Sequence, residues 1–168
     1  MRGGAIYIDS NVSTLLLTIE GNSLFNANRS TDGTIRIDSG SLLDAASVIR
    51  NTDFTLNDNL NAGVIYSEFK KGVLTLNNVN FTQNKSVIGT VLYTSHAQDT
   101  DTDRSLIRFE SCTFSANTGT SVLYLFNGNV YSTVETDTCT FNSNDGPVVK
   151  VEYGLYIDNS STYSGNTG

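Results

Sequence analysis

The fold follows from the stretch Leu74-Thr75-Leu76-Asn77-Asn78-Val79-Asn80-Phe81-Thr82-Gln83-Asn84. Its first half alternates apolar and polar residues, which is typical of a half-buried strand. Its second half ends in the signature aromatic-x-x-Asn, which occurs six times in the chain at intervals of 29, 27, 33, 27 and 22 residues. Such a period predicts one structural unit stacked on itself. The six pairs are Phe25 and Asn28, Phe54 and Asn57, Phe81 and Asn84, Phe114 and Asn117, Phe141 and Asn144, and Tyr163 and Asn166.

A second alternating segment follows a glycine in most repeats, as in Gly33-Thr34-Ile35-Arg36-Ile37. Each repeat therefore contains at least two strands with a turn between them. No window has the apolar spacing of a helix, and a β-sandwich does not require the same residue at the same place in each repeat. We predict an all-β fold, a right-handed parallel β-helix (solenoid) of about six rungs. Residues 1–168 are expected to form one domain, as a fragment or stacking unit of a longer chain.

Stacked rungs assign the signature residues to two ladders. The aromatic rings are predicted to stack inside, while the asparagines hydrogen-bond up and down a corner at which Asn tolerates the left-handed backbone. Cys112 and Cys139 each precede a signature Phe by two residues, as Val79 does one rung earlier. They are predicted to be buried, reduced neighbours, and their spacing of about 5 Å leaves a disulfide as the alternative. A further internal ladder is expected from Ile19, Val48, Leu76, Phe109, Val134 and Ile157.

The segment Gly3-Gly4-Ala5-Ile6 precedes the first Phe-x-x-Asn copy. Together they resemble the paired GGA(I/L/V) and FxxN repeats of polymorphic membrane proteins, which are β-helical autotransporter adhesins, and of similar protist surface proteins. The FxxN half covers nearly the whole chain, whereas the other half is intact once and elsewhere degrades to forms such as Asp32-Gly33-Thr34-Ile35. The resemblance implies a β-helical protein, extracellular or at the cell surface, that acts in adhesion. It carries over no catalytic residues.

The chain is acidic, with a net charge of −7 and only ten Lys and Arg residues. This balance argues against nucleic acid and anionic membrane as partners. No apolar run is long enough to cross a bilayer, so direct membrane insertion is not expected.

A polar insertion over residues 94–104 interrupts the longest repeat and contains the single histidine, His96. Asp99, Asp101 and Asp103 have the first three ligand spacings of a calcium loop, but the glycine at position six and the distal Glu are missing. We interpret the insertion as a solvated loop that serves in recognition, with weak calcium binding as the alternative. No other cofactor is expected.

Three tyrosines, Tyr7, Tyr66 and Tyr156, are expected to face outward on strands. There they either bind a partner, together with His96 in the loop, or are ordinary strand formers. The chain is therefore expected to be a non-catalytic surface protein that acts in adhesion or as a rigid spacer and contacts a host-cell protein or glycan.

Two other functions are open. One is a fibre-forming subunit whose copies pair their open strand edges end to end. The other is a fragment of a polysaccharide-active enzyme, which needs carboxylates aligned on adjacent rungs. The candidate carboxylates are Glu20, Asp53, Glu110 and Asp137. They do not align with one another relative to the signature, which argues against catalysis.

Overall fold

The computed structural model describes residues 4–8, 14–38, 41–96, 104–127 and 132–168. These residues form nineteen β-strands and no helix, and every pair of neighbouring strands is parallel. Accordingly, no described segment is a helix long and apolar enough to cross a membrane.

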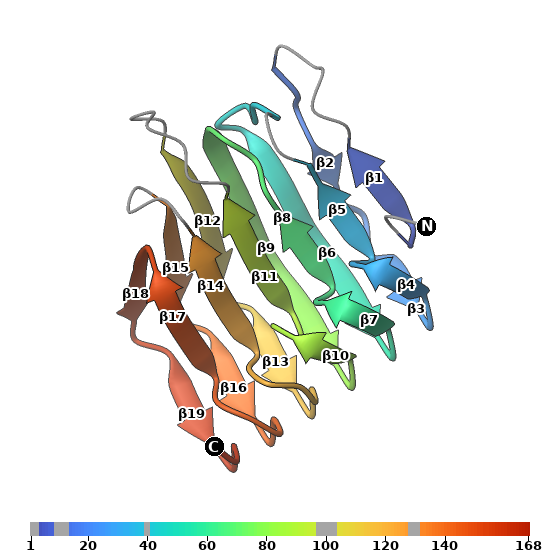
Figure 1. Cartoon of the computed structure of the whole chain (residues 1–168), viewed down its shortest axis with the longest axis vertical. Coiled ribbons are helices and arrows are strands. Elements are labelled where there is room, and N and C mark those ends of the chain that lie inside the picture. The colour runs from blue at the N-terminus through green and yellow to red at the C-terminus, as the bar shows by residue number, and fades with distance from the viewer. Residues whose placement is uncertain (1–3, 9–13, 39–40, 97–103, 128–131) are drawn as a thin grey trace.

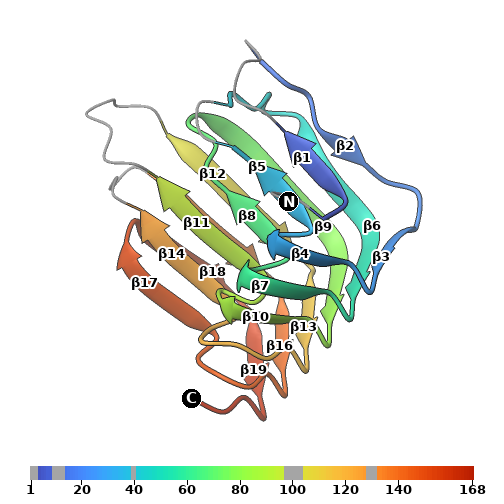
Figure 2. The ribbon, with the colours of Figure 1, turned by 45° about the vertical axis from the view of Figure 1, so that its right-hand side comes forward.

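The strands belong to three sheets, which run side by side along the molecule (Figures 1 and 2). The six-stranded sheet contains β1 (Ile6–Ile8), β5 (Ile35–Ile37), β8 (Ile65–Ser67), β11 (Leu92–His96), β14 (Leu123–Asn127) and β17 (Val149–Tyr153). The three-stranded sheet contains β4 (Arg29–Asp32), β7 (Asp58–Ala62) and β10 (Lys85–Ile88). The ten-stranded sheet contains β2 (Thr18–Ile19), β3 (Ser23–Asn26), β6 (Ser47–Thr55), β9 (Gly72–Thr82), β12 (Ser105–Glu110), β13 (Thr113–Ser115), β15 (Thr133–Asp137), β16 (Thr140–Asn142), β18 (Leu155–Asn159) and β19 (Thr162–Ser164).

Neighbours within each sheet come from successive repeats of the sequence, so the chain coils around a common core. The prediction of a parallel β-helix is confirmed, with about five turns. Figure 1 shows the rungs in sequence order, from β1 near the N-terminus to β19 near the C-terminus.

The signature aromatic residues stack in register inside the solenoid. Centroids of successive rings lie 4.7, 5.2, 5.3, 4.4 and 5.0 Å apart, with near-parallel planes. The central rings, from Phe54 to Phe141, are fully buried, whereas Tyr163 at the end of the ladder is 47% exposed. Each buried ring contributes roughly 1.5–3 kcal/mol through the apolar area that it removes from water.

The signature asparagines form a second ladder beside the rings. The backbone N–H and the Nδ2 of each asparagine donate to the Oδ1 of the next, as between Asn84 and Asn117 at 3.0 and 3.1 Å. The Nδ2 of Asn84 also donates to the carbonyl oxygen of Phe54, one rung back, at 2.9 Å. The same pattern recurs at every interval from Asn28 to Asn166. The ladder thus satisfies polar groups that the turn would otherwise leave buried and unpaired.

The left-handed backbone lies beside the signature asparagines, not at them, which corrects the expectation from the sequence. Two positions in every rung have positive φ, one three residues before the aromatic residue and one two residues after it. The first set is Asn22, Asn51, Asn78, Ser111, Thr138 and Ser160, and the second is Ala27, Leu56, Gln83, Ala116, Ser143 and Gly165. These two corners bend the chain on either side of the stacked ring and leave the asparagine side chain free to span the rungs.

Thr138 is the one β-branched residue in these corners, with a φ of 54°. A β-branched side chain crowds the left-handed backbone, whereas Asn, which occupies the corresponding position in three rungs, tolerates it. Thr138→Asn is therefore expected to raise the free energy of unfolding by about 1 kcal/mol. Urea denaturation measures this change, with Thr140→Asn on regular strand β16 as the control. An equal gain in both variants, or a loss in Thr138→Asn, contradicts the backbone explanation.

The other internal ladder has a different register from the one predicted. Its members are Ile19, Ile49, Leu76, Phe109, Thr136 and Asp158. The prediction for Val48, Val134 and Ile157 is wrong, because the apolar residue nearest the expected place is not the residue in register. A shift of one position moves a side chain to the opposite face of the sheet, as at Val48 and Ile157. Val134 is still buried, in the neighbouring internal row beside Ile107.

Cys112 and Cys139 lie in adjacent rungs, and both are buried free thiols. The Sγ of Cys112 donates to the carbonyl oxygen of Leu76, and the Sγ of Cys139 donates to that of Phe109, each at 3.4 Å. Burial raises the pKa of the Cys112 thiol well above its usual value, so this thiol stays protonated.

Candidate binding surface

The outer face of the six-stranded sheet carries one row of aromatic and basic side chains. Strand pairing brings the row together from six rungs that are far apart in the sequence. Its members, in order along the solenoid, are Tyr7, Arg36, Tyr66, Tyr93, Tyr124 and Lys150.

The side chains of this row pack on one another. The guanidinium of Arg36 lies 4.3 Å from the ring centroid of Tyr66, and the Tyr66 and Tyr93 rings are stacked 5.3 Å apart. Tyr124 lies tilted 5.5 Å from Tyr93, and the Nζ of Lys150 lies 4.4 Å from the Tyr124 centroid. A cation thus lies over the aromatic ring at each end of the series, where the electron-rich face of the ring attracts it. Because these faces contact neighbours, the middle of the row offers little ring face to a ligand.

Arg36 is the centre of a charged cluster at the N-terminal end of the row. It is only 8% exposed, and its guanidinium lies 3.0 Å from carboxylate oxygens of Asp38 and Glu68 and 3.7 Å from Asp32. Two tyrosines donate to the same carboxylates, Tyr7 to Asp38 at 2.8 Å and Tyr66 to Glu68 at 2.6 Å. Burial raises the pKa of Glu68, and the nearby Asp38 adds to this shift. Burial, together with the bond to Glu68, also raises the pKa of Tyr66 above its usual value.

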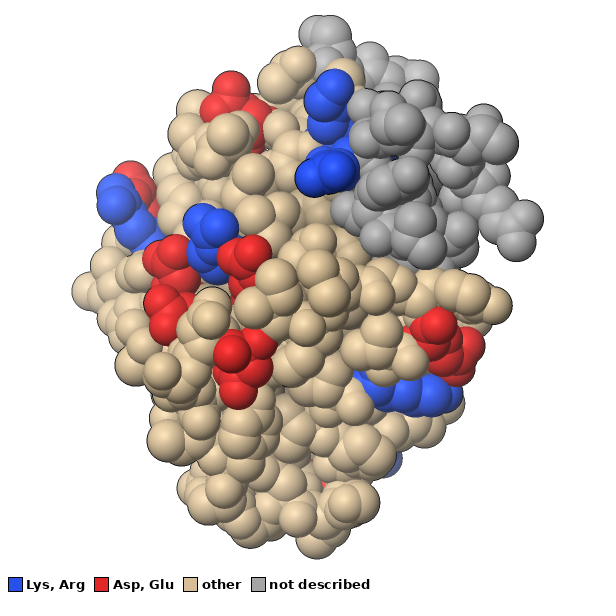
Figure 3. All heavy atoms as spheres, turned by 90° about the vertical axis from the view of Figure 1, so that its left-hand side faces the viewer, with Lys and Arg blue, Asp and Glu red and all other residues tan. Residues whose placement is uncertain are grey.

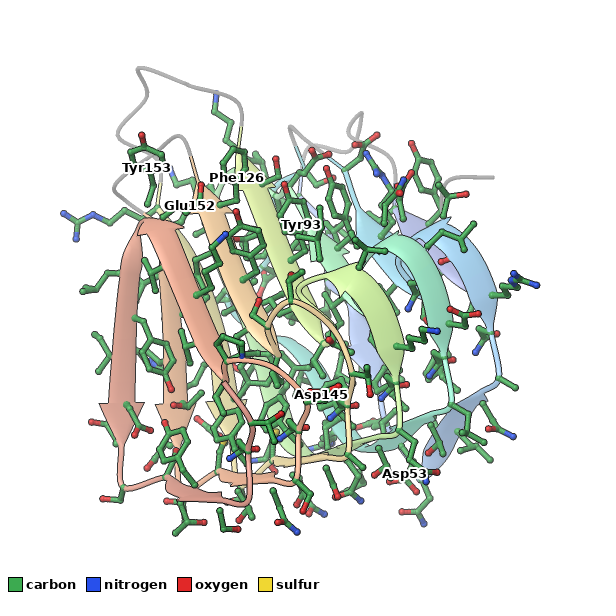
Figure 4. The ribbon with its side chains drawn as sticks, turned by 60° about the horizontal axis from the view of Figure 1, so that its bottom comes forward. Asp53, Tyr93, Phe126, Asp145, Glu152 and Tyr153 are labelled. Atoms are coloured by element: carbon green, nitrogen blue, oxygen red, sulfur yellow. The ribbon has the colours of Figure 1, made fainter. Side chains whose placement is uncertain are left out.

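The C-terminal end of the row is more open. Phe126 on β14 and Tyr153 on β17 occupy paired positions and are 41% and 56% exposed. The Phe126 ring lies 6.4 Å from that of Tyr93, nearly parallel, and 6.0 Å from that of Tyr124. We call these four residues, Tyr93, Tyr124, Phe126 and Tyr153, the aromatic patch. Figure 4 shows the labelled Tyr93, Phe126 and Tyr153 on the same side of the sheet.

An ion pair lies beside the aromatic patch. The Nζ of Lys150 is 2.8 Å from a carboxylate oxygen of Glu152, and the hydroxyl of Tyr124 donates to the same carboxylate. Glu152 is labelled near Phe126 and Tyr153 in Figure 4. The patch therefore combines exposed apolar rings with hydroxyl and charged groups at its border.

The structure places two of the three predicted tyrosines, Tyr7 and Tyr66, in this row. Tyr156 is not among them, which corrects the prediction that it faces outward. It lies on β18 of the ten-stranded sheet, paired with Val134, and packs against the core. Its hydroxyl lies 2.8 Å from the Oγ1 of Thr136. The register of β18 differs by one residue from the predicted alternation, which exchanges the buried and exposed faces.

Tyr93 and Tyr124 belong to the row although the sequence did not single them out. Tyr7 and Tyr66 each follow a glycine by three residues, whereas Tyr93 follows Gly89 by four. Strand β10, just before Gly89, pairs irregularly with β7, so the rung contains a shift that glycine-based alignment misses. The one remaining sequence signal for Tyr93 was that it could pair with another tyrosine, Tyr66, in the neighbouring rung.

The predicted site residues of the inserted loop lie outside the described part of the chain, wholly or by their side chains. The backbone of His96 ends β11 and pairs with Asn127, but its side chain is not described. Asp99, Asp101 and Asp103 lie outside the described residues. Within the described ranges, no group of three or more His, Cys, Asp or Glu side chains is arranged to hold a metal ion.

Two carboxylates do align on the outer face of the ten-stranded sheet, contrary to the expectation from the sequence. Glu110 and Asp137 occupy paired positions on β12 and β15, because each precedes its signature Phe by four residues. Glu110 accepts a hydrogen bond from the Nδ2 of Asn77 at 3.0 Å. The neighbouring pair of Arg108 and Glu135 forms an ion pair at 2.8 Å. On the face that Figure 3 shows, several basic side chains lie beside acidic ones.

No protein-family model matches the chain, and neither curated proteins nor solved structures include a significant match. The resemblance to the repeats of polymorphic membrane proteins stays a prediction.

Proposed function

We propose that this chain is a non-catalytic β-solenoid, extracellular or at the cell surface, that acts in adhesion by presenting the aromatic patch to a host-cell protein or glycan. The observation that carries the proposal is the exposure of Phe126 and Tyr153 beside Tyr93 and Tyr124 on one sheet. Aromatic side chains with polar tips are the typical anchors of protein and sugar contacts.

The patch sits on a rigid support. Its strands β11, β14 and β17 pair with one another in the six-stranded sheet, and the stacked rings and hydrogen-bonded asparagines fix each rung relative to the next. Preorganised groups lose little conformational entropy on binding, so a contact of this kind gains affinity from the scaffold. The same rigidity would let the solenoid act as a spacer that holds the patch at a fixed position.

The open end of the patch is the part best suited to a ligand. The faces of Tyr66 and Tyr93 are covered by neighbours, whereas Phe126 and Tyr153 retain exposed area. The Lys150–Glu152 ion pair offers a donor and an acceptor next to these rings. An exposed aromatic group with a polar border is the composition expected of a binding hot spot.

The test is binding of the purified chain to host cells and to immobilised glycans and cell-surface proteins. The variant Phe126→Ser with Tyr153→Ser is expected to weaken binding at least about tenfold, since aromatic hot-spot residues dominate interface energies. The matched control is Leu60→Ser with Val87→Ser, which removes apolar side chains that are 50% and 59% exposed on β7 and β10. Equal binding by wild type and the patch variant, or an equal loss in the control, contradicts the assignment to this surface.

A further inference from the structure

A hollow of about 420 Å³ lies on the outer face of the ten-stranded sheet, over the first residues of β9, β12 and β15. These three strands are neighbours in the sheet (Figure 1). The volume is within the usual range of small-molecule sites. Six of the residues that line the hollow alternate with buried ones and so carry their side chains on the outer face: Lys71, Val73, Arg104, Leu106, Thr133 and Glu135.

Two cations lie side by side at one end of this hollow. The backbone N–H of Gly72 donates to the carbonyl oxygen of Arg104 at 3.1 Å, and Gly72 pairs with Ser105. Continued by one residue, this register brings Lys71 opposite Arg104, and both residues are exposed. The chain as a whole has 17 acidic and ten basic residues, so the pair is a local reversal of its charge. An anion at this end can be bound by two positively charged groups at once.

The floor of the hollow is largely aliphatic. Val73 pairs with Leu106 across β9 and β12, and Leu106 pairs with Thr133 on β15. All three residues are half-buried. Val73 and Leu106 each follow one of the two cations by two residues, which places all four side chains on one face of the sheet. The floor can therefore take the C–H face of a ring whose charged group lies at the cations.

The other end of the hollow carries a hydrogen-bond acceptor. Glu135 lies two residues beyond Thr133 on the same face, and its carboxylate accepts from the Nε of Arg108 at 2.8 Å. The side chain of Glu135 is 22% exposed. A carboxylate has lone pairs for several donors, so Glu135 can accept a hydroxyl group of a ligand while it stays paired with Arg108.

We propose that this hollow binds a sugar acid, with the carboxylate of the sugar between Lys71 and Arg104. The ring lies on the aliphatic floor, and a ring hydroxyl donates to Glu135. A neutral sugar lacks the anion that the two cations bind. A fatty acid would place its apolar chain against the Glu135 carboxylate and desolvate it without supplying a donor.

This inference goes beyond the proposed adhesive function, because the hollow and the aromatic patch lie on different sheets. The hollow selects its ligand by charge, whereas the patch presents exposed rings. The two sites can therefore be tested independently.

Titration of the 168-residue chain with sodium glucuronate, followed by amide NMR spectra, tests the proposal. Saturable shifts are expected for the amides of Gly72, Leu106 and Thr133. No comparable shifts are expected on β14 or β17, which carry the exposed part of the aromatic patch. Glucose, the neutral analogue, is expected to leave the same amides unchanged.

The double variant Lys71→Gln with Arg104→Gln is expected to weaken glucuronate binding at least about tenfold, since it removes two charge-assisted hydrogen bonds. Both residues are exposed, so the fold is expected to persist. The matched control is Arg29→Gln with Lys85→Gln, which removes the same charge from two exposed residues of the three-stranded sheet. The control is expected to bind glucuronate like wild type.

Absence of saturable glucuronate binding overturns the proposal, and so does an equal loss of affinity in the two double variants. Acetate that binds as tightly as glucuronate, or triglutamate that binds more tightly, overturns the assignment to a sugar acid. The patch variant Phe126→Ser with Tyr153→Ser is expected to bind glucuronate like wild type. A failure of the adhesive function is thereby distinguished from a failure of this site.

Discussion

Phe81→Ala is expected to lower the free energy of unfolding by about 3–5 kcal/mol, the range for deleting a fully buried Phe side chain. Phe81 is 0% exposed, and its ring is stacked between Phe54 and Phe114 at 5.2 and 5.3 Å and meets the edge of Phe109 at 6.1 Å. Removal of this ring interrupts the aromatic ladder in its middle. Collapse of the cavity is hindered, because hydrogen-bonded strands hold the rungs on both sides at fixed spacing. Urea denaturation followed by circular dichroism measures the loss.

The control for this substitution is Tyr163→Ala in the last rung. Its ring belongs to the same ladder but is 47% exposed and has a ring neighbour in the ladder on one side only, Phe141. The loss there is expected to be clearly smaller. Equal losses at both positions contradict a continuous buried ladder with its centre near Phe81.

Asn84→Ala is expected to destabilise the fold by at least about 3 kcal/mol, because each buried polar group left without a partner costs about 1–3 kcal/mol. Asn84 is 1% exposed. Its Oδ1 accepts from the backbone N–H and Nδ2 of Asn57, and its Nδ2 donates to the carbonyl oxygen of Phe54. The substitution deprives all three groups of these bonds, and Asn57 and Phe54 are both 0% exposed.

Asn80→Ala is the matched control for the asparagine ladder. Asn80 is exposed on β9, the strand that precedes Asn84, and its Nδ2 donates to Asp53 at 2.8 Å. An exposed bond of this kind exchanges readily with water, so a loss below about 1 kcal/mol is expected. If both alanine variants unfold at the same urea concentration, the buried ladder does not stabilise the corner.

The fold could be predicted from the sequence because the repeated aromatic residue, which is the strongest signal in the sequence, is also the most buried part of each rung. A residue type that returns at Phe54, Phe81 and Phe114 must satisfy the same surroundings each time, and stacked rungs provide such surroundings. The predicted register was wrong where the residue type at one position changes from apolar to polar between rungs. Thr136 and Asp158 continue the row of Leu76 and Phe109, yet an apolar pattern cannot select a Thr or an Asp for an internal position.

The left-handed corners were predictable only in part. Asn22, Asn51 and Asn78 carry a residue type that tolerates positive φ, whereas Leu56 and Gln83 give no such signal. At these positions the surrounding ladders impose the backbone on residues that do not prefer it.

The binding surface was harder to predict than the fold. Tyr7 and Tyr66 were found from alternation, but their neighbours Tyr93 and Tyr124 are brought beside them by the pairing of strands in rungs of different length. Phe126 and Tyr153 depend on an irregular pairing between β14 and β17. A surface assembled across rungs needs each register to be known, since an error of one residue removes a side chain from the face.

The most direct test of the stacked solenoid is nuclear Overhauser spectroscopy on a sample with labelled phenylalanine rings and asparagine side-chain amides. Contacts are expected from the Phe81 ring to the rings of both Phe54 and Phe114, together with slowly exchanging Nδ2 protons on Asn84 and Asn117. Absence of these ring contacts, with rapid exchange of the same amides in a folded chain, would contradict the ladder on which the rod and its binding face depend.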